Sequence, residues 1–352
     1  MRLPGRFRPR LLLALLALLV PGAFARQQAG PEPIFITETE ALRLAYATEA
    51  LGIQLQALTV HNPAPVDGEA EKAAEGEEGE EGPAPLDLFA ASLAQVDPAL
   101  LEDLTSALGE VERIQAADAD GLREAVEHAR SLVDQAREVL VPQALQADPV
   151  FRAALLVKLD LSEVGPGEGY EEAAHGQQEA FAVGFSALQR LKALWAGLLP
   201  ELPAGATTQK VEQALADFDA LMPTAQPPAR YRDPEDAETA AQDLAFGLEA
   251  ATDQTLFPHD FQTALALVEH DAQAACASAG AGKQSLAIER TLATSLAYRK
   301  HIADSLAFIM PELNTTLLTL LQDKLPQAIQ TNQDAHAICK QLQEALASAG
   351  GT

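Results

Sequence analysis

GLREAVEHARSLVDQAREVL, residues 121–140, indicates the fold class of this chain. Its apolar residues recur every three or four positions, and charged residues fill most positions between them. An α-helix places residues at this spacing on one face, whereas a β-strand requires strict alternation. The stretch therefore predicts an amphipathic helix with one face against a helical core. The apolar stripe consists of Leu122, Ala125, Val126, Ala129, Leu132, Val133, Ala136 and Leu140.

Similar helical patterns recur along the rest of the chain and predict an all-α protein. Ala and Leu are abundant, and both favour helix. Thr37-x-x-Glu40 has the order of a capping box and predicts a helix that runs to about Thr59. Three further helix starts combine an N-cap Asp with a Pro at the first helical position: Asp97-Pro98, Asp148-Pro149 and Asp233-Pro234.

Two linkers divide these predicted helices. Residues 60–85 form an acidic stretch that cannot bury enough apolar area to order itself, so we expect a disordered, solvated spacer. Residues 223–233 contain three prolines and predict a second linker. We therefore expect an N-terminal helical domain over residues 26–222 and a C-terminal helical bundle over residues 234–352.

The two predicted domains share one order of features, namely Pro, helix, Gly loop, long helix and a (Leu/Met)-Pro-Glu-Leu motif. This order predicts two tandem, duplicated up-down four-helix bundles, with extra N-terminal helices packed on the first. Chance spacing in Pro-punctuated helices is the alternative. The matching positions are Pro142, Gly165 and Leu199–Leu202 in the first copy, and Pro258, Gly280 and Met310–Leu313 in the second.

Residues 1–25 have the pattern of a cleavable signal peptide. Four Arg precede an unbroken apolar run from Leu11 to Val20, and Ala23-Phe24-Ala25 supplies the small-x-small cleavage pattern. As a helix this run reaches about 15 Å, which is too short to span a bilayer. We expect cleavage after Ala25, no membrane insertion, and a mature chain that is periplasmic or secreted.

The acidic composition restricts the partners of the protein. The chain has 24 Lys and Arg against 51 Asp and Glu, a net charge of −27, and cleavage would leave 20 basic residues and a charge of −31. Nucleic acid and anionic membrane surfaces would repel such a chain. Metal ions, cationic ligands and basic proteins are compatible with it, although solubility alone also explains the charge.

Two cysteines, Cys276 and Cys339, lie on predicted helices of the C-terminal bundle. An oxidising compartment permits a disulfide between them. The sequence does not set their Cα separation, so two buried free thiols are the alternative.

The strongest candidate site lies between Gly169 and Glu179. Glu171 and Glu172 precede His175 by four and three positions, and Glu179 follows it by four. On one continuous helix these side chains project from neighbouring turns of the same face. Carboxylates with imidazole can bind Fe, Mn or Zn, so the set predicts a site for iron or another divalent metal. A solvated salt-bridge face is the alternative.

A second charged pattern, Arg123-Glu124-x-x-Glu127, resembles the iron-binding signature of ferric permeases. In this amphipathic helix, alternating charges also predict a surface ladder that needs no metal. The predicted pairs are Arg123–Glu127, Glu127–Arg130, Arg130–Asp134 and Asp134–Arg137.

Residues 161–195 include Gly167-Glu-Gly-Tyr-Glu-Glu and Leu188-Gln-Arg-Leu-Lys-Ala-Leu-Trp195. This segment loosely resembles helical exported accessory proteins of bacterial iron-permease systems. The resemblance implies metal handling beside a membrane permease partner. The imelysin-type motif Gly-x-His-x-x-Glu is not matched, because this chain has His175-x-x-x-Glu179.

No linear signature of an enzyme is present: the chain has no Gly-x-Ser-x-Gly elbow, no Cys/His protease pattern and no phosphate-binding Gly loop. We therefore predict a non-enzymatic, exported binding or accessory protein, with iron handling as its most specific form. The alternative is a structural or protein-interaction scaffold with no small ligand.

Overall fold

The computed structural model describes residues 38–60, 84–114, 119–331 and 333–350, and these residues contain helices and no strands. The all-α prediction is thereby confirmed for the described part of the chain. The predicted signal peptide, Thr37 and most of the acidic linker lie outside the described residues. Within them, no helix combines the length and apolar character that crossing a membrane requires.

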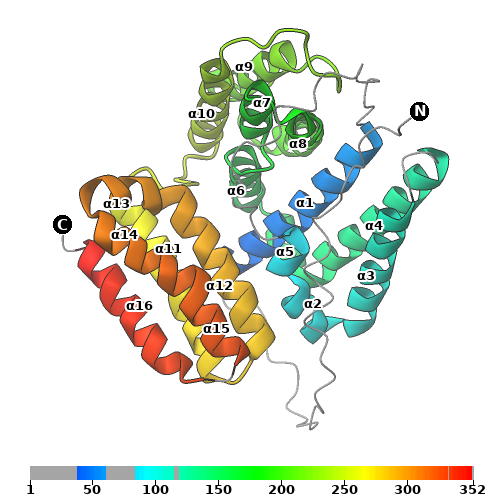
Figure 1. Ribbon diagram of the computed structural model, residues 1–352. Helices are drawn as coiled ribbons and strands as arrows, with labels where there is room; N and C mark the ends of the chain where they lie inside the picture. Colours follow the sequence, from blue (N-terminus) through cyan, green and yellow to red (C-terminus); the bar gives the residue numbers. More distant parts are fainter. Residues whose placement is uncertain (1–37, 61–83, 115–118, 332, 351–352) are drawn as a thin grey trace, which may run out of the picture.

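The helices form two groups, each with its own hydrophobic core (Figure 1). The first group consists of α1 (Glu38–Val60), η2 (Pro85–Leu88), α2 (Ala90–Val96), α3 (Pro98–Arg113), α4 (Ala119–Leu140), α5 (Gln143–Gln146), α6 (Pro149–Asp160), α7 (Pro166–Ala174), α8 (Gln178–Leu198), η3 (Leu199–Glu201), α9 (Ala206–Leu221) and α10 (Pro234–Thr252). The second group consists of α11 (Phe261–Gly280), α12 (Gln284–Tyr298), the π-helical η4 (Arg299–Ala303), α13 (Asp304–Ile309), α14 (Pro311–Leu318), the π-helical η5 (Thr319–Lys324), α15 (Leu325–Gln330) and α16 (Ala335–Gly350).

The predicted Asp-Pro helix starts are confirmed. The Asp97 carboxylate accepts a hydrogen bond from the Leu100 N–H at 3.0 Å, and Asp148 accepts one from the Phe151 N–H at 3.0 Å. Asp233 caps α10 in the same way. Each side chain satisfies an N–H group that has no partner within its helix, while the following Pro lacks the N–H that would also need one.

α1 lies at the centre of the first group, where it packs against α4, α6 and α8. Most of its residues are buried, and Figure 1 shows the blue helix between the green and cyan helices. α4 covers one side of α1 with the predicted stripe, whose seven residues from Ala125 to Leu140 are buried. The helical period of this stretch is therefore confirmed.

The boundary between the two cores falls after α10, not in the predicted linker at residues 223–233. α10 packs against α6, α7 and α9, and its Leu244 and Leu248 belong to the first core. The second core begins at Ala264, so residues 234–252 do not belong to the C-terminal bundle as predicted. The apolar period identifies the buried face of a helix but not the helices that cover it.

The two groups also differ in helix order. The segment after Gly165 forms two helices, α7 and α8, whereas the segment after Gly280 runs from α12 through η4 into α13. This arrangement does not show the two matching four-helix bundles that the sequence predicts.

A buried charged network joins the two cores. Arg43 of α1 is 8 % exposed and donates to the Glu289 carboxylate of α12 at 2.8 Å, to Glu40 at 3.0 Å and to the Leu88 carbonyl. Glu289, 1 % exposed, also accepts the Ser92 backbone N–H at 2.9 Å and the Ser92 hydroxyl at 2.6 Å. Because buried charges are stable only when paired and hydrogen-bonded, this network holds α12 against α1 and α2.

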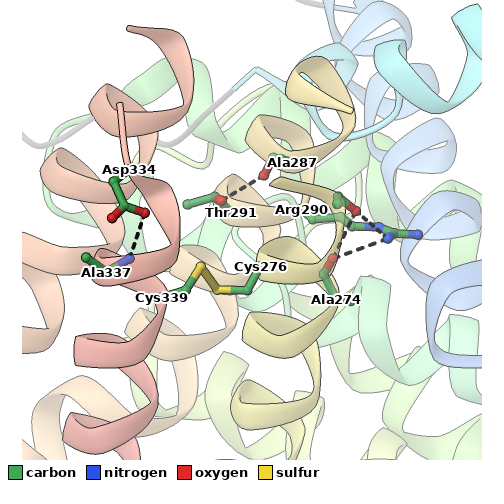
Figure 2. Close-up of a disulfide and its surroundings, with 9 residues drawn as sticks. Ala274, Cys276, Ala287, Arg290, Thr291, Asp334, Ala337 and Cys339 are labelled. Carbon is green, nitrogen blue, oxygen red and sulfur yellow. Dashed lines mark hydrogen bonds between the residues drawn. A yellow bond between two sulfur atoms is a disulfide. The ribbon is translucent and has the colours of Figure 1, made fainter. Parts of the chain in front are cut away.

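A disulfide joins Cys276 of α11 to Cys339 of α16, with 5.8 Å between the Cα atoms (Figure 2). The structure therefore has the disulfide and not the alternative of two free thiols. Between α11 and α12, Arg290 of α12 donates to the Ala274 carbonyl at 3.3 Å (Figure 2). α11 is thus tied to one neighbour covalently and to the other by a charged side chain.

Candidate functional site

The four predicted metal ligands do not lie on one helix. α7 ends before His175, and Gly176 has a φ of +108°, a conformation that favours glycine. The Gln177 N–H donates to the Glu172 carbonyl at 3.0 Å, as in the Schellman motif that ends many helices. α8 begins at Gln178 and packs against α7. The prediction of a continuous helix through His175 is therefore wrong.

This break separates the predicted ligands. Glu171 and Glu172 belong to α7, His175 lies at the turn, and Glu179 lies in the first turn of α8. Glu171, His175 and Glu179 are exposed. Across the described ranges, no group of three or more His, Cys, Asp or Glu residues is arranged to hold a metal ion. Metal binding by this set stays a prediction from the sequence.

The charges of α4 also depart from the predicted surface ladder. Asp134 and Arg137 pair at 3.1 Å, as predicted. Arg130 and Arg137, however, also turn towards α1, where Arg130 bonds to the Gln56 amide oxygen and Arg137 to the Glu49 carboxylate. These contacts define a different candidate site.

The candidate site is a cleft of about 240 Å³ between α1, α4 and α8. α1 and α8 supply most of its apolar wall, and arginines from α4 and α8 supply positive charge. The residues that matter below are Glu49, Gly52, Ile53 and Val60 of α1, Arg130, Asp134 and Arg137 of α4, and Phe185, Ser186 and Arg190 of α8.

Glu49 is the buried charge of the cleft, with 5 % exposure. It accepts two hydrogen bonds from the Arg190 guanidinium, the Nε bond at 2.6 Å, and a third from Arg137. Burial by itself raises the pKa of Glu49, but the hydrogen bonds and charges of Arg190 and Arg137 outweigh it and hold the pKa below its ordinary value. The ionised carboxylate therefore joins α1, α4 and α8 at one point.

Two further features of the cleft are an unused donor and open space. The Ser186 hydroxyl is buried, and it has no hydrogen-bond partner in the part of the chain that the structure describes. Such a group costs about 1–3 kcal/mol of stability. On α1, a Cβ placed at Gly52 would meet no atom within 4 Å. The cleft thus has room for ligand atoms beside Gly52, whereas the Ser186 hydroxyl is enclosed within the packing of its wall.

A second hollow of about 400 Å³ lies against the disulfide, between the end of α11 and the start of α16. Its polar side chains, including His336, Lys340 and Gln343, are exposed. Ligand sites combine a concave surface with a few polar groups in fixed positions. We place the candidate site at the smaller cleft because burial fixes Glu49 and Ser186 there.

Comparison of this chain with protein-family models, curated proteins and solved structures gives no match. The resemblance to iron-permease accessory proteins therefore stays a prediction, and function is inferred from geometry. Sequence reasoning missed Glu49, Arg190 and Ser186 as site residues. One usable signal was the position of Glu49 in a helix that is apolar on most sides, because a charge there needs a buried partner.

Proposed function

We propose that this chain is an exported, non-enzymatic binding protein that holds a small ligand in the cleft between α1, α4 and α8. The observation that carries the proposal is the cleft wall, where the buried carboxylate of Glu49 is held between Arg137 and Arg190 and open space lies beside Gly52. Packing alone would favour apolar side chains at these positions, because they leave no polar group to satisfy. A ligand in the cleft would contact these fixed charges and the apolar side chains beside them.

Export is the second part of the proposal. The signal-peptide pattern before Ala25 supports it, as does the disulfide between Cys276 and Cys339, since disulfides persist mainly in oxidising compartments. A periplasmic or secreted location is consistent with both features.

Ligand-observed NMR tests binding in the cleft. The full mature chain is screened with small neutral, cationic, zwitterionic and anionic compounds, and the screen is repeated on Gly52→Leu, whose side chain would extend into the cleft. We expect at least one class of compound to bind the wild type and to lose its signal with Gly52→Leu. The matched control is Gly109→Leu on an exposed position of α3, where an added Cβ also meets no atom. A panel whose signals are the same for Gly52→Leu and the wild type would contradict the proposal.

A protein-interaction scaffold without a small ligand is the alternative, and one observation favours it. Phe308 and Ile309, at the end of α13, are 91 % and 61 % exposed. Large apolar side chains grouped on a surface often mark protein contacts. If this alternative holds, Gly52→Leu is silent, and replacing Phe308 and Ile309 by Ser weakens self-association or partner binding in sedimentation experiments.

Iron handling beside a membrane permease also stays a proposal, with the sequence resemblance and the residues around His175 as its support. Metal analysis of protein purified without chelator tests it, together with the His175→Ala variant. Stoichiometric Fe, Mn or Zn that is lost in the variant is the expected result, and a metal-free wild type would end this proposal. The tandem duplication likewise keeps only its sequence support, the shared order of Pro and Gly positions.

A further inference from the structure

The disulfide lies near the ends of the two helices that it joins (Figure 2). Cys276 is one turn before Gly280, the last residue of α11, and Cys339 is one turn after Ala335, the first residue of α16. Both cysteines line the hollow of about 400 Å³ between these helix ends. A water molecule takes about 30 Å³ in the liquid, so the hollow has room for a small organic molecule beside the disulfide.

The two cysteines differ in exposure. Cys276 is half-buried, whereas Cys339 is 6 % exposed. A disulfide is broken when a thiolate attacks one of its sulfur atoms, and the rate depends on access to that atom. A thiol in the hollow therefore has better access to Cys276, so that Cys339 is the sulfur that leaves.

The charges of the hollow lie on the side of Cys339. α11 contributes uncharged residues to the lining, whereas α16 and the residue before it contribute ionisable ones, namely Asp334, His336 and Lys340. The Asp334 carboxylate accepts the Ala337 N–H at 3.3 Å at the start of α16. Lys340 directly follows Cys339, and its ammonium lies 3.7 Å from Glu344. A nearby ammonium stabilises a thiolate, so this side chain favours Cys339 as the leaving group.

We propose that the disulfide is an exchange site for small thiols in the folded protein. The attacking thiolate bonds to Cys276 Sγ, the Sγ–Sγ bond breaks, and its electron pair leaves on Cys339 Sγ, which takes a proton from water. A second thiolate then attacks the small-molecule sulfur of the mixed disulfide and releases Cys276 as a thiolate. Two small thiols are thereby oxidised to one disulfide, and the protein disulfide is reduced to two thiols.

α16 has contacts that do not depend on the disulfide. Its buried side chains belong to the second core, and it packs against α14 and α15 as well as α11. The buried residues are Leu342, Ala345, Leu346 and Ala349. A disulfide enclosed in a core is reduced when the chain unfolds, whereas exchange at this one requires entry of a thiol into the hollow.

The urea dependence of reduction tests the inference. The full chain is treated with dithiothreitol, samples are quenched with acid and alkylated in denaturant, and mass spectrometry counts the alkylated cysteines. Below the unfolding transition, we expect the rate to change little with urea, because the folded protein reacts directly. A rate that rises with urea in step with the unfolded fraction would overturn the inference.

The monothiol 2-mercaptoethanol identifies the sulfur that is attacked. Acid quenching traps the mixed disulfide, and digestion with pepsin, which works in acid, allows it to be mapped by mass spectrometry. We expect the adduct on Cys276. An adduct mainly on Cys339 would overturn the roles assigned to the two cysteines.

Gly280→Leu tests the hollow as the route of entry. Gly280 lines the hollow, and a Cβ there would meet no atom within 4 Å, so the larger side chain is compatible with the fold and narrows the hollow. We expect reduction of the folded protein to slow several-fold. The matched control is Gly109→Leu on an exposed position of α3, which should react as the wild type does. An unchanged rate in Gly280→Leu would overturn the inference.

Lys340→Gln tests the leaving group. Loss of the ammonium beside Cys339 should slow reduction several-fold, because the thiolate that leaves is less stable. Lys210→Gln, at an exposed lysine of α9 in the first group, is the matched control and should leave the rate unchanged. Equal rates for Lys340→Gln and the wild type would overturn the role of Lys340.

Discussion

Arg43 and Glu289 are buried side chains of opposite charge, and each compensates the charge of the other. They lie 2.8 Å apart on α1 and α12. Removal of Glu289 would leave Arg43 with Glu40, a partner that Arg43 shares with Arg290, and would also leave the Ser92 amide and hydroxyl without their acceptor.

A double-mutant cycle tests this pair. Glu289→Ala should lower the free energy of unfolding by about 3 kcal/mol, because it leaves buried donors and a buried charge unsatisfied. The double variant Arg43→Met with Glu289→Leu should cost less than the sum of the single changes, since it removes both charges together. Urea denaturation measures the free energy of unfolding of each variant. Strictly additive losses in the double variant would contradict the coupling between Arg43 and Glu289.

His301, in η4, gives the stability a pH dependence. Burial, with Lys158 and Lys300 nearby, lowers the pKa of His301 from 6.5 to about 4. Between these two pH values the unfolded chain binds a proton that the folded chain does not, so the free energy of unfolding falls as pH drops from about 6.5 to 4. The loss should be about 1–2 kcal/mol after allowance for solvent screening of a partly exposed ring.

Denaturation curves at several pH values measure this effect. A His301→Gln variant, which cannot gain the proton, should show a flatter profile in the same range. A profile as steep as that of the wild type would show that other groups cause the pH dependence.

Some residue roles in this chain follow from local sequence, and others depend on distant partners. The cap roles of Asp97, Asp148 and Asp233 could be predicted because the Pro that follows makes the signal local. The roles of Glu49 and Arg130 could not, since an acidic or basic residue has the same identity at a surface or in a core. A partner on another helix decides whether such a residue can lie in the core.

At the scale of elements, the turn between α7 and α8 depends on one glycine. Gly176 has a φ of +108°, so Gly176→Ala should destabilise the protein by about 1–2 kcal/mol through backbone strain, although a Cβ there meets no atom within 4 Å. Gly109→Ala is the matched change on α3, where the backbone is helical, and it should stabilise by about 0.5–1 kcal/mol. Thermal unfolding of the two variants measures both signs, and equal shifts would contradict this account of the turn.

His175-Gly176 was also the sequence signal for the end of α7. Glycine just after the last helical residues commonly terminates a helix, whereas the charge spacing around His175 favoured a continuous one. The glycine turn determines where the helix ends, because a pair of side chains on a helix surface stabilises the helix by only a few tenths of a kcal/mol.

The disulfide between α11 and α16 closes a long segment, with a sequence separation of 63 residues. Reduction, or the double change Cys276→Ser and Cys339→Ser, should lower the free energy of unfolding of the second core by about 2–4 kcal/mol. Circular dichroism follows both cores, whereas the fluorescence of Trp195, the one tryptophan, follows the first core. We expect reduction to shift the dichroism transition more than the fluorescence transition. Identical transitions before and after reduction would contradict a stabilising role.

At the scale of the whole molecule, the export prediction concerns residues that the structure does not describe. Expression with an intact N-terminus in a bacterial host should give a mature chain that begins at Arg26 and has lost the four signal-peptide arginines. Intact-mass measurement of the periplasmic fraction or medium checks this. A chain that keeps residues 1–25, or one that stays with the membranes, would contradict the prediction.

The sequence by itself determined that the described chain is helical, where several helices begin, and which face of α4 is buried. These features depend on interactions within a few residues, such as caps and a 3.6-residue period. Only the tertiary structure decided that α10 joins the first core, that α7 and α8 fold back on each other, and that Glu49, Arg130 and Ser186 meet at one cleft. An apolar face specifies that a helix must be covered, not which helix covers it, so contacts between distant segments require the packed structure.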